Sequence, residues 1–306
     1  MKIIIVGLGV QGIKRKKFFV SNQKFIAGVD PYSKYADYKY LQDVPLDHYD
    51  ACFLCVPDNI KSKLITYCLT NHKHILVEKP LLVKNEKEIL FMQTKARKND
   101  QIIYSAYNHR FEPHIKRMKK LIETNKLGKI YSCKMFYGNG TARLVRDSKW
   151  RDSGLGVLGD LGPHLLDICN YFFGNLKKNF NLVSSVKNEN KSPDHVIINS
   201  NFKKIYIQLE MSLCMWKNQF YCDIIGEKGS AHIESLCKWG PSKFTYRNRK
   251  LPSGKPKENI FLIKKNDPTW KLEHLYFNNL LKLKNKTNLQ KDIWILKNLN
   301  NFKKLI

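Results

Sequence analysis

The chain has 306 residues, of which 43% are hydrophobic, and its 54 basic residues against 26 acidic ones give a formal net charge of +28. That length is enough for two globular domains that each bury a core. No window approaches the ~18 uninterrupted apolar residues of a membrane span. Three glycines and a basic run follow the apolar start, and this order is wrong for a secretory signal.

The eight cysteines are scattered, mostly inside apolar segments, as buried thiols of a reducing compartment would be. We therefore expect a cytoplasmic protein that does not contact a membrane. Cys52 and Cys55 form a C-x-x-C within a predicted strand, where positions i and i+3 point to opposite faces. This pair therefore predicts neither a redox site nor a metal site.

The charge normally suggests a nucleic-acid partner. Only 9 of the 54 basic residues are arginine, however, and the lysines are spread along a chain that is also rich in Asn, Ile, Phe and Tyr. Codon bias in an A/T-rich genome produces that composition without any polyanion, and no arginine–aromatic recognition block is present. We expect no specific nucleic-acid partner, and we leave the positive field a role in attracting anionic substrates.

The first stretch of the chain carries the clearest motif. A β-branched run ends at residue 6, and the loop at residues 7–12 reads G-L-G-V-Q-G before a basic amphipathic run from 13 to 20. A strand, a G-x-G-x-x-G loop and a helix in this order are typical of a dinucleotide-binding unit, with a diphosphate at the helix N-terminus. Glycine turns also occur there for steric reasons alone. The motif predicts a cofactor site that includes Gly7, Gly9, Val10, Gln11 and Gly12.

An acidic residue follows at the expected distance. A short strand over 24–30 ends in Asp30, 18 residues after Gly12. An acid there accepts hydrogen bonds from the adenosine ribose and repels a 2′-phosphate, so it favours NAD over NADP, although Lys34 can soften the preference. The structural alternative is an ordinary turn aspartate before Pro31.

Strands and helices alternate up to residue 106, which predicts an α/β Rossmann domain with a doubly wound parallel sheet over 1–120. The expected strands are 51–56, 74–78 and 101–106, and the expected helices are 60–70 and 85–97. One strand ends in Glu78, Lys79 and Pro80, and charges at such a strand end point into the crevice where open α/β sheets bind ligands. Pro57, Glu78 and Lys79 complete the predicted cofactor site.

From residue 121 the pattern changes. Strands at 129–136, 182–187, 195–200, 204–213, 219–226 and 230–236 follow one another with short turns, and a helix is expected over 154–173. Strands in series indicate a mostly antiparallel sheet, so residues 121–306 are predicted to form an α+β domain for substrate binding and oligomerisation. Two helical stretches, 270–281 and 289–305, close the chain.

Several motifs together resemble the glucose-fructose oxidoreductase / inositol dehydrogenase family, Gfo/Idh/MocA. They are Glu78-Lys79-Pro80, the glycine-rich run at 153–167 with D-x-x-x-H-x-x-D, N-x-R-F-x-P at 108–113, the turn at 226–230, and Glu273 with Phe277. The resemblance covers nearly the whole chain. One departure is the run Gly154-Leu155-Gly156, which often reads G-G-G in the family and bears on the shape of the substrate loop.

The resemblance implies an NAD(P)-dependent oxidoreductase with Lys79, Asp160 and His164 at the reacting carbon and no metal. Asp160 and His164 are four residues apart at the start of a predicted helix, so they share one face and can address one hydroxyl. We assign proton transfer to His164, orientation of the oxygen to Lys79 and positioning to Asp160, although Lys79 and His164 can exchange roles. The structural alternatives are that Lys79 is a surface lysine, His164 a buried core histidine and Asp160 a helix N-cap.

The expected substrate is a sugar, a cyclic polyol or a nucleotide sugar. Candidate substrate contacts are Asn108, Arg110, Trp150 and Arg151. Relatives commonly pair through the open face of the antiparallel sheet, which implies a homo-oligomer, either a dimer or a tetramer. The alternative function is a catalytically inactive, dinucleotide-sensing regulatory protein of the same fold; retention of Lys79, Asp160 and His164 argues against it.

Overall fold

The computed structural model describes residues 1–148, 151–174, 176, 179–264, 266–284 and 286–306. The chain divides into two units, Met1–Asn108 with Pro268–Leu296 and His109–Asp267 with Lys297–Ile306. The expected boundary lay at residue 120, whereas the first segment of the first unit ends at Asn108, and a C-terminal segment also belongs to that unit.

The first unit contains a sheet of five parallel strands in the order β2-β1-β3-β4-β5, as far as the chain is described. Its strands are β1 (Lys2–Val6), β2 (Lys24–Val29), β3 (Ala51–Leu54), β4 (His74–Glu78) and β5 (Ile103–Ala106). Its helices include α1 (Val10–Lys16), α2 (Asp58–Thr70), α3 (Glu86–Lys98) and α8 (Thr269–Lys282). The predicted doubly wound parallel sheet is therefore confirmed.

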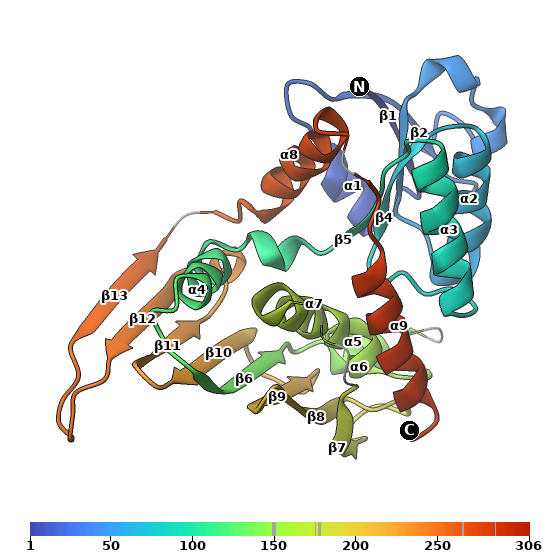
Figure 1. Cartoon of the computed structure of the whole chain (residues 1–306). Coiled ribbons are helices and arrows are strands. Elements are labelled where there is room, and N and C mark those ends of the chain that lie inside the picture. Colours follow the sequence, from blue (N-terminus) through green and yellow to red (C-terminus); the bar gives the residue numbers. More distant parts are fainter. Residues whose placement is uncertain (149–150, 175, 177–178, 265, 285) are drawn as a thin grey trace. The chain divides into compact units, whose positions relative to one another are not determined.

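Alternate residues of the strands face the two sides of this sheet. Ile4 and Val6 belong to the core under α2 and α3, whereas Ile3 and Ile5 belong to the opposite core. Figure 1 shows α2 and α3 on one side of the sheet and α8 on the other. Cys52 of β3 packs into the first core and Cys55 against the second, so the two thiols point to opposite faces as expected.

Helix α8 belongs to the first unit because its apolar side completes the second core. Phe277 is fully buried, and its ring lies edge-on to Phe53 of β3 with the ring centroids 5.6 Å apart. The amphipathic pattern predicts the helix itself, but it does not specify which domain the apolar side covers.

The second unit contains an eight-stranded sheet in the order β13-β12-β11-β10-β6-β9-β8-β7 within the described residues. The strands are β6 (Ile130–Gly138), β7 (Asn181–Val186), β8 (His195–Phe202), β9 (Ile205–Ser212), β10 (Gln219–Gly226), β11 (Gly229–Glu234), β12 (Ser242–Asn248) and β13 (Glu258–Ile263). The β6–β9 pair is parallel and the other pairs are antiparallel, which confirms the mostly antiparallel sheet. The sequence did not predict β12 and β13: most residues of β12 are polar, and β13 is an edge strand whose consecutive apolar residues, mostly exposed, do not alternate with polar ones.

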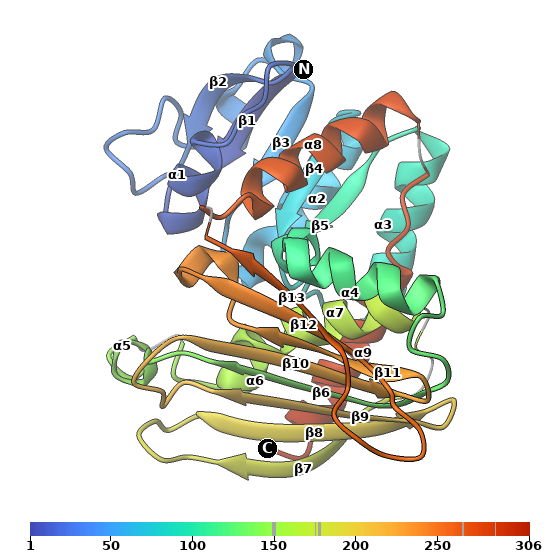
Figure 2. The ribbon, with the colours of Figure 1, turned by 90° about the vertical axis from the view of Figure 1, so that its left-hand side faces the viewer.

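One face of this sheet is covered by helices. Helices α4 (Pro113–Glu123) and α7 (Gly162–Phe173) lie on the same face in Figures 1 and 2, over buried residues such as Cys222 and Leu209. The opposite face exposes large side chains, among them Tyr221 and Ile225 of β10.

The helix expected over 154–173 is two segments. Helix α6 (Val157–Asp160) ends before Leu161, and α7 begins at Gly162. Pro163 stands in the first turn of α7 and has no N–H to donate to the preceding turn, so the helix is interrupted there. Asp160 is therefore the last residue of α6, and His164 lies in the first turn of α7.

The other described elements are 3-10 turns and two further helices. The turns are η1 (Leu41–Asp43), η2 (Leu46–His48), η3 (Asn108–Phe111) and η4 (Cys237–Trp239), and the helices are α5 (Ala142–Arg146) and α9 (Gln290–Lys303). Among the described residues, no helix is long and apolar enough to cross a membrane.

Candidate active site

The glycine loop after β1 is tightly packed at two of its three glycines. Gly7 has φ +91°, and a Cβ there would lie 2.3 Å from the Cys55 carbonyl oxygen. A Cβ at Gly12 would lie 1.9 Å from the Gly7 carbonyl oxygen. At Gly9 the corresponding space holds no atom within 4 Å. The first and third glycines therefore allow the turn to form, and the second leaves the backbone open to a ligand.

The start of α1 offers donors beside this open space. Gly9 is the N-cap of α1 without a side-chain cap, and Val10 is 81% exposed. The first N–H groups of a helix have no partner within the helix, which suits an anion. Asp30 reaches the same loop, where one carboxylate oxygen accepts a 2.8 Å hydrogen bond from the Leu8 N–H.

The second oxygen of Asp30 accepts hydrogen bonds from the N–H groups of Tyr32 and Ser33, at 2.9 and 3.2 Å. Asp30 thus also holds its own turn, as the structural alternative predicts. Each carboxylate oxygen has further acceptor capacity, so the two roles are compatible.

Lys79 directly follows β4, and its backbone is fixed by a lysine that the sequence did not single out. Lys61 of α2 is buried, and its Nζ donates 2.8 Å hydrogen bonds to the carbonyl oxygens of Glu78 and Pro80 on both sides of Lys79. Asp58, one turn earlier, pairs with the same Nζ at 2.6 Å. Burial lowers the pKa of Lys61, and Asp58 opposes this effect. The i, i+3 spacing from Asp58 was the available sequence signal, but it is common on exposed helices.

Glu78 accepts a hydrogen bond from a buried arginine instead of facing open solvent. The Arg15 guanidinium donates Nε to Glu78 at 2.5 Å and a terminal nitrogen to Glu273 of α8 at 3.0 Å. Tyr104 donates to the other Glu273 oxygen at 3.2 Å. This Arg15 bridge connects the helix after the glycine loop, the strand end before Lys79 and α8. Glu78 thus has a structural contact with Arg15, and its place in the cofactor site stays a prediction.

Glu273 is fully buried in the bridge. Burial raises the pKa of Glu273 to about 7, against the opposing influence of Arg15, and the charge of Glu78 raises it further. The carboxyl group therefore takes up a proton near neutral pH.

In the second unit, His164 lies in a buried cluster of polar rings. Its ring centroid is 4.0 Å from that of His109 in η3 and 6.1 Å from that of Tyr137 in β6. Burial, reinforced by the charge of Asp160, raises the pKa of Tyr137 well above its usual range. Tyr137 thus remains a neutral phenol near both predicted catalytic residues of this unit.

Lys238 of η4 completes the cluster and was not predicted. Its Nζ lies 3.0 Å from His109 Nε2 and donates to the Tyr137 hydroxyl at 2.9 Å. Lys238 is far from His164 in the sequence and belongs to no motif, so only the folded sheet brings the two into one cluster.

Asp160, 41% exposed, forms a long ion pair of 3.4 Å with Arg151.

Arg110 donates two hydrogen bonds to the buried Asp167, at 3.1 and 2.5 Å, which joins N-x-R-F-x-P to the last acid of D-x-x-x-H-x-x-D. Asn108 belongs to the first unit, where it donates to Thr269 at 2.9 Å. The prediction for Trp150 falls outside the described residues.

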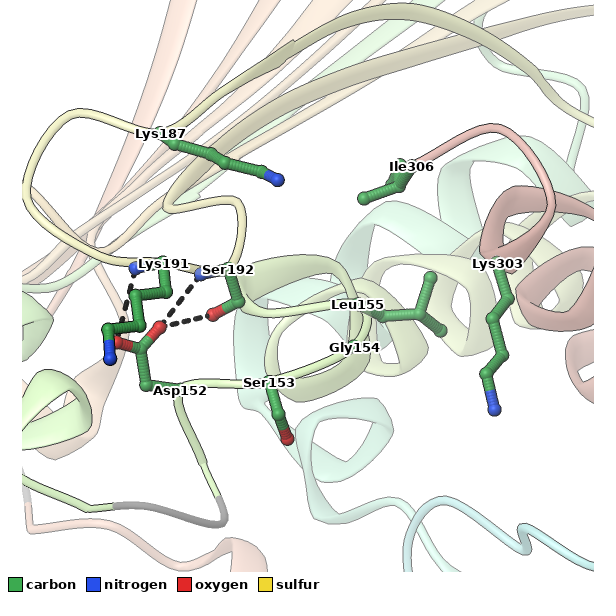
Figure 3. Close-up of a pocket in the computed structure, with 9 residues that line it drawn as sticks. All are labelled: Asp152, Ser153, Gly154, Leu155, Lys187, Lys191, Ser192, Lys303 and Ile306. Carbon is green, nitrogen blue, oxygen red and sulfur yellow. Dashed lines mark hydrogen bonds between the residues drawn. The ribbon is translucent and has the colours of Figure 1, made fainter.

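The start of the glycine-rich run, together with Asp152 before it, borders a pocket of about 370 Å³ in the second unit (Figure 3). Asp152 anchors this segment, because its carboxylate accepts hydrogen bonds from the N–H groups of Lys191 and Ser192 and from the Ser192 hydroxyl. Burial by itself would raise the pKa of Asp152, but these hydrogen bonds together lower it. Lys187 and Lys303 also line the pocket.

Two family models match the chain in sequence. Residues 1–107 match the oxidoreductase family, NAD-binding Rossmann fold, and residues 115–232 match the GFO/IDH/MocA C-terminal domain. The chain belongs to the GFO/IDH/MocA family. The predicted resemblance is thereby confirmed, and residues 1–107 form the family's NAD-binding domain.

Curated members of the GFO/IDH/MocA family are similar over part of their length. Glucose-6-phosphate 3-dehydrogenase of Bacillus subtilis is 28% identical over 198 residues, which cover 61% of this chain and 53% of the relative. Myo-inositol 2-dehydrogenase of Thermotoga maritima is 28% identical over 125 residues, covering 41% and 36%. The chain thus spans about half the length of the first relative and about a third of the second.

Solved structures show the same fold over the whole chain. Levoglucosan dehydrogenase in complex with NADH has a TM-score of 0.80 at 16% identity and covers 100% of this chain and 97% of its own. An oxidoreductase of Agrobacterium radiobacter in complex with NAD+, L-tartaric acid and magnesium has a TM-score of 0.78 at 14% identity, with 98% and 94% covered. The open backbone at Gly9 and the donors at the start of α1 fit the diphosphate of NAD, which is the cofactor of this family domain.

The raised pKa of Glu273 predicts a pH-dependent stability. A carboxyl whose pKa is raised from 4.5 to about 7 stabilises the fold fully below pH 4.5, and this contribution is lost as the pH rises through 7. The loss is about 3 kcal/mol in the free energy of unfolding. Urea unfolding at pH 5 to 8 should show this decline in the wild type and a weaker one in Glu273→Gln. The exposed Asp47→Asn is the control, and an unchanged decline in Glu273→Gln would contradict the assignment.

Proposed function

We propose that the protein is an NAD-dependent dehydrogenase or reductase that transfers a hydride between nicotinamide and a secondary alcohol or ketone of a sugar, cyclic polyol or nucleotide sugar. The supporting observation is the buried His164, which lies among His109, Tyr137 and Lys238 at the start of α7. A histidine among other proton donors and acceptors suits general acid–base catalysis.

In this proposal each side chain has a distinct task. Bound NAD supplies the hydride acceptor, and the alcohol must also lose its hydroxyl proton. His164 accepts that proton during oxidation and returns it during reduction. Lys79, held in place by Lys61, orients the substrate oxygen as a cation, and Asp160 positions the hydroxyl. In the alternative assignment, Lys79 transfers the proton and His164 orients the substrate oxygen.

The substrate class is supported by the relatives and by charge. By their names, one relative acts on a phosphorylated glucose and another on myo-inositol. The formal charge of +28 favours an anionic form of such a substrate, because a positive surface raises its local concentration. Arg151, paired with the partly exposed Asp160, is the candidate substrate contact that lies closest in sequence to the reacting residues.

Substitution of the proposed catalytic residues should reduce turnover without loss of the fold. We expect Lys79→Met and His164→Asn each to lower kcat by about 10² to 10⁴, the usual contribution of positioned acid–base groups. NADH binding by His164→Asn, measured by fluorescence, should stay within about threefold of the wild type, which corresponds to less than 1 kcal/mol. The assay is a panel of sugar phosphates, inositols and nucleotide sugars with NAD and NADP in parallel.

Matched controls are Lys84→Met and His72→Asn, which change exposed residues of the same unit as Lys79. Full activity in both Lys79→Met and His164→Asn would contradict the site assignment. Tight NAD binding without nicotinamide reduction on any member of the panel would instead favour the dinucleotide-sensing regulator.

The cofactor preference should depend on the charge of Asp30. Asp30→Asn keeps an oxygen that can accept the Leu8 hydrogen bond but removes the charge that repels a 2′-phosphate. We expect the ratio of kcat/KM for NAD to that for NADP to fall by about tenfold or more, or about 1.4 kcal/mol. The control is Asp37→Asn, because the Asp37 carboxylate also accepts a backbone hydrogen bond, from the Gly28 N–H. An unchanged ratio would show that Asp30 only holds its turn.

We further propose a homo-oligomer, a dimer or a tetramer, that pairs through the sheet face opposite α4 and α7. Tyr221, 43% exposed on this face, would be buried by such pairing. Light scattering should give a multiple of the 35.9 kDa chain mass, and Tyr221→Glu should reduce it. Tyr32→Glu, at a 96% exposed tyrosine of the first unit, should leave the mass unchanged. A monomeric wild type would contradict this assembly.

A further inference from the structure

His109 has no task in the proposed reaction, yet it is the ring closest to His164 among the described aromatic contacts. The two rings are tilted by 40° with centroids 4.0 Å apart, and both side chains are buried. Two positive charges about 4 Å apart repel each other by about 4 kcal/mol at an effective dielectric constant near 20. Beyond the one N–H that each neutral ring carries, the pair therefore takes up one additional proton far more readily than two.

Lys238 determines which ring can hold that proton. A lysine ammonium has donors only, so the 3.0 Å contact requires His109 Nε2 to accept. The proton of His109 is then on Nδ1, and the ring is neutral. A protonated His109 would instead direct an N–H at the ammonium.

The position of Lys238 is itself fixed by buried contacts. The preceding residue, Cys237, donates its N–H to one oxygen of the buried Glu112 at 3.0 Å and its thiol to the other at 2.7 Å. The ammonium also donates to Tyr137 at 2.9 Å and lies 4.5 Å from the centre of the Trp239 ring. These contacts hold the Nζ against His109.

We propose that Lys238 is a positioning residue for His164: by donating to His109 Nε2 it keeps His109 neutral, so that when the stacked histidine pair takes up an additional proton, His164 becomes the charged ring. This inference rests on the proposed role of His164 in proton transfer. Among the described residues of the second unit, the other charged or titratable groups near the pair include Tyr137 of β6, Asp160 of α6, Asp167 of α7 with its partner Arg110, and Glu112 before α4 with its neighbours Cys237 and Asp267.

The test measures the protonation of both rings without any substrate. In the full-length protein labelled with ¹⁵N-histidine, the ring signals of His109 and His164 are assigned with His109→Gln and His164→Gln and followed by NMR from pH 8 to 5. In the wild type we expect His164 to protonate first, while His109 stays neutral with its proton on Nδ1. In Lys238→Met, the pKa of His109 should rise by about one unit or more because a nearby cation is gone.

Lys238→Arg retains the charge and a donor and should restore the wild-type order. Lys243→Met, which alters a half-exposed lysine on β12, is the control and should not change either ring. If His109 titrates identically in the wild type and in Lys238→Met, or protonates before His164 in the wild type, the proposal is wrong. Should Lys238→Met fail to fold, Lys238→Gln provides the same comparison.

A kinetic measurement then connects the cluster to turnover. We expect Lys238→Met to lower kcat about tenfold or more and to shift the acid limb of its pH profile, with the KM for NAD unchanged and with both effects rescued in Lys238→Arg. An unaltered pH profile would overturn the link to His164. If the wild type turns over no substrate, the proposed function fails, but the NMR titration still decides whether Lys238 controls His109.

Discussion

The first unit depends on one buried guanidinium. Arg15 is 1% exposed and contacts carboxylates from two distant segments, Glu78 before Lys79 and Glu273 in α8. A buried charge is tolerated only when it is paired and hydrogen-bonded, and removal of one partner of a buried pair costs about 3 to 5 kcal/mol. The glycine-loop helix, the end of β4 and α8 are thus tied to one another. The same bridge joins the glutamates of two separate motifs, E-K-P and E-x-x-x-F.

In the second unit, the side chains around His164 form a buried polar cluster and not an ion-pair bridge. Polar rings and an ammonium meet beneath the helices: the His109 ring packs against that of His164, and the Lys238 ammonium contacts His109 Nε2 and the Tyr137 hydroxyl. Burial makes such contacts specific, because an unmade hydrogen bond inside the fold costs the full desolvation of the group. Arg110 and Asp167 stabilise the same region through a bidentate pair, which orders η3 against α7.

The net charge of +28 does not come from the side chains around the glycine loop or around His164 alone. The excess of lysine is distributed along the chain, and the buried lysine Lys61 acts through two backbone carbonyls and Asp58 and not through the overall field. Surface charge attracts or repels ligands over a distance set by salt. The specificity of the proposed reaction must therefore reside in the few oriented side chains of the sites.

The sequence by itself determined the doubly wound sheet, the mostly antiparallel sheet and the family. These follow from local patterns: hydrophobic period, glycine spacing and short motifs such as Glu78-Lys79-Pro80. It missed β12 and β13, the break at Pro163 and the return of α8 to the first unit. Only the tertiary structure brought Lys61 to the strand end before Pro80 and Lys238 to His109, because these contacts join residues far apart in the chain that share no periodic signal.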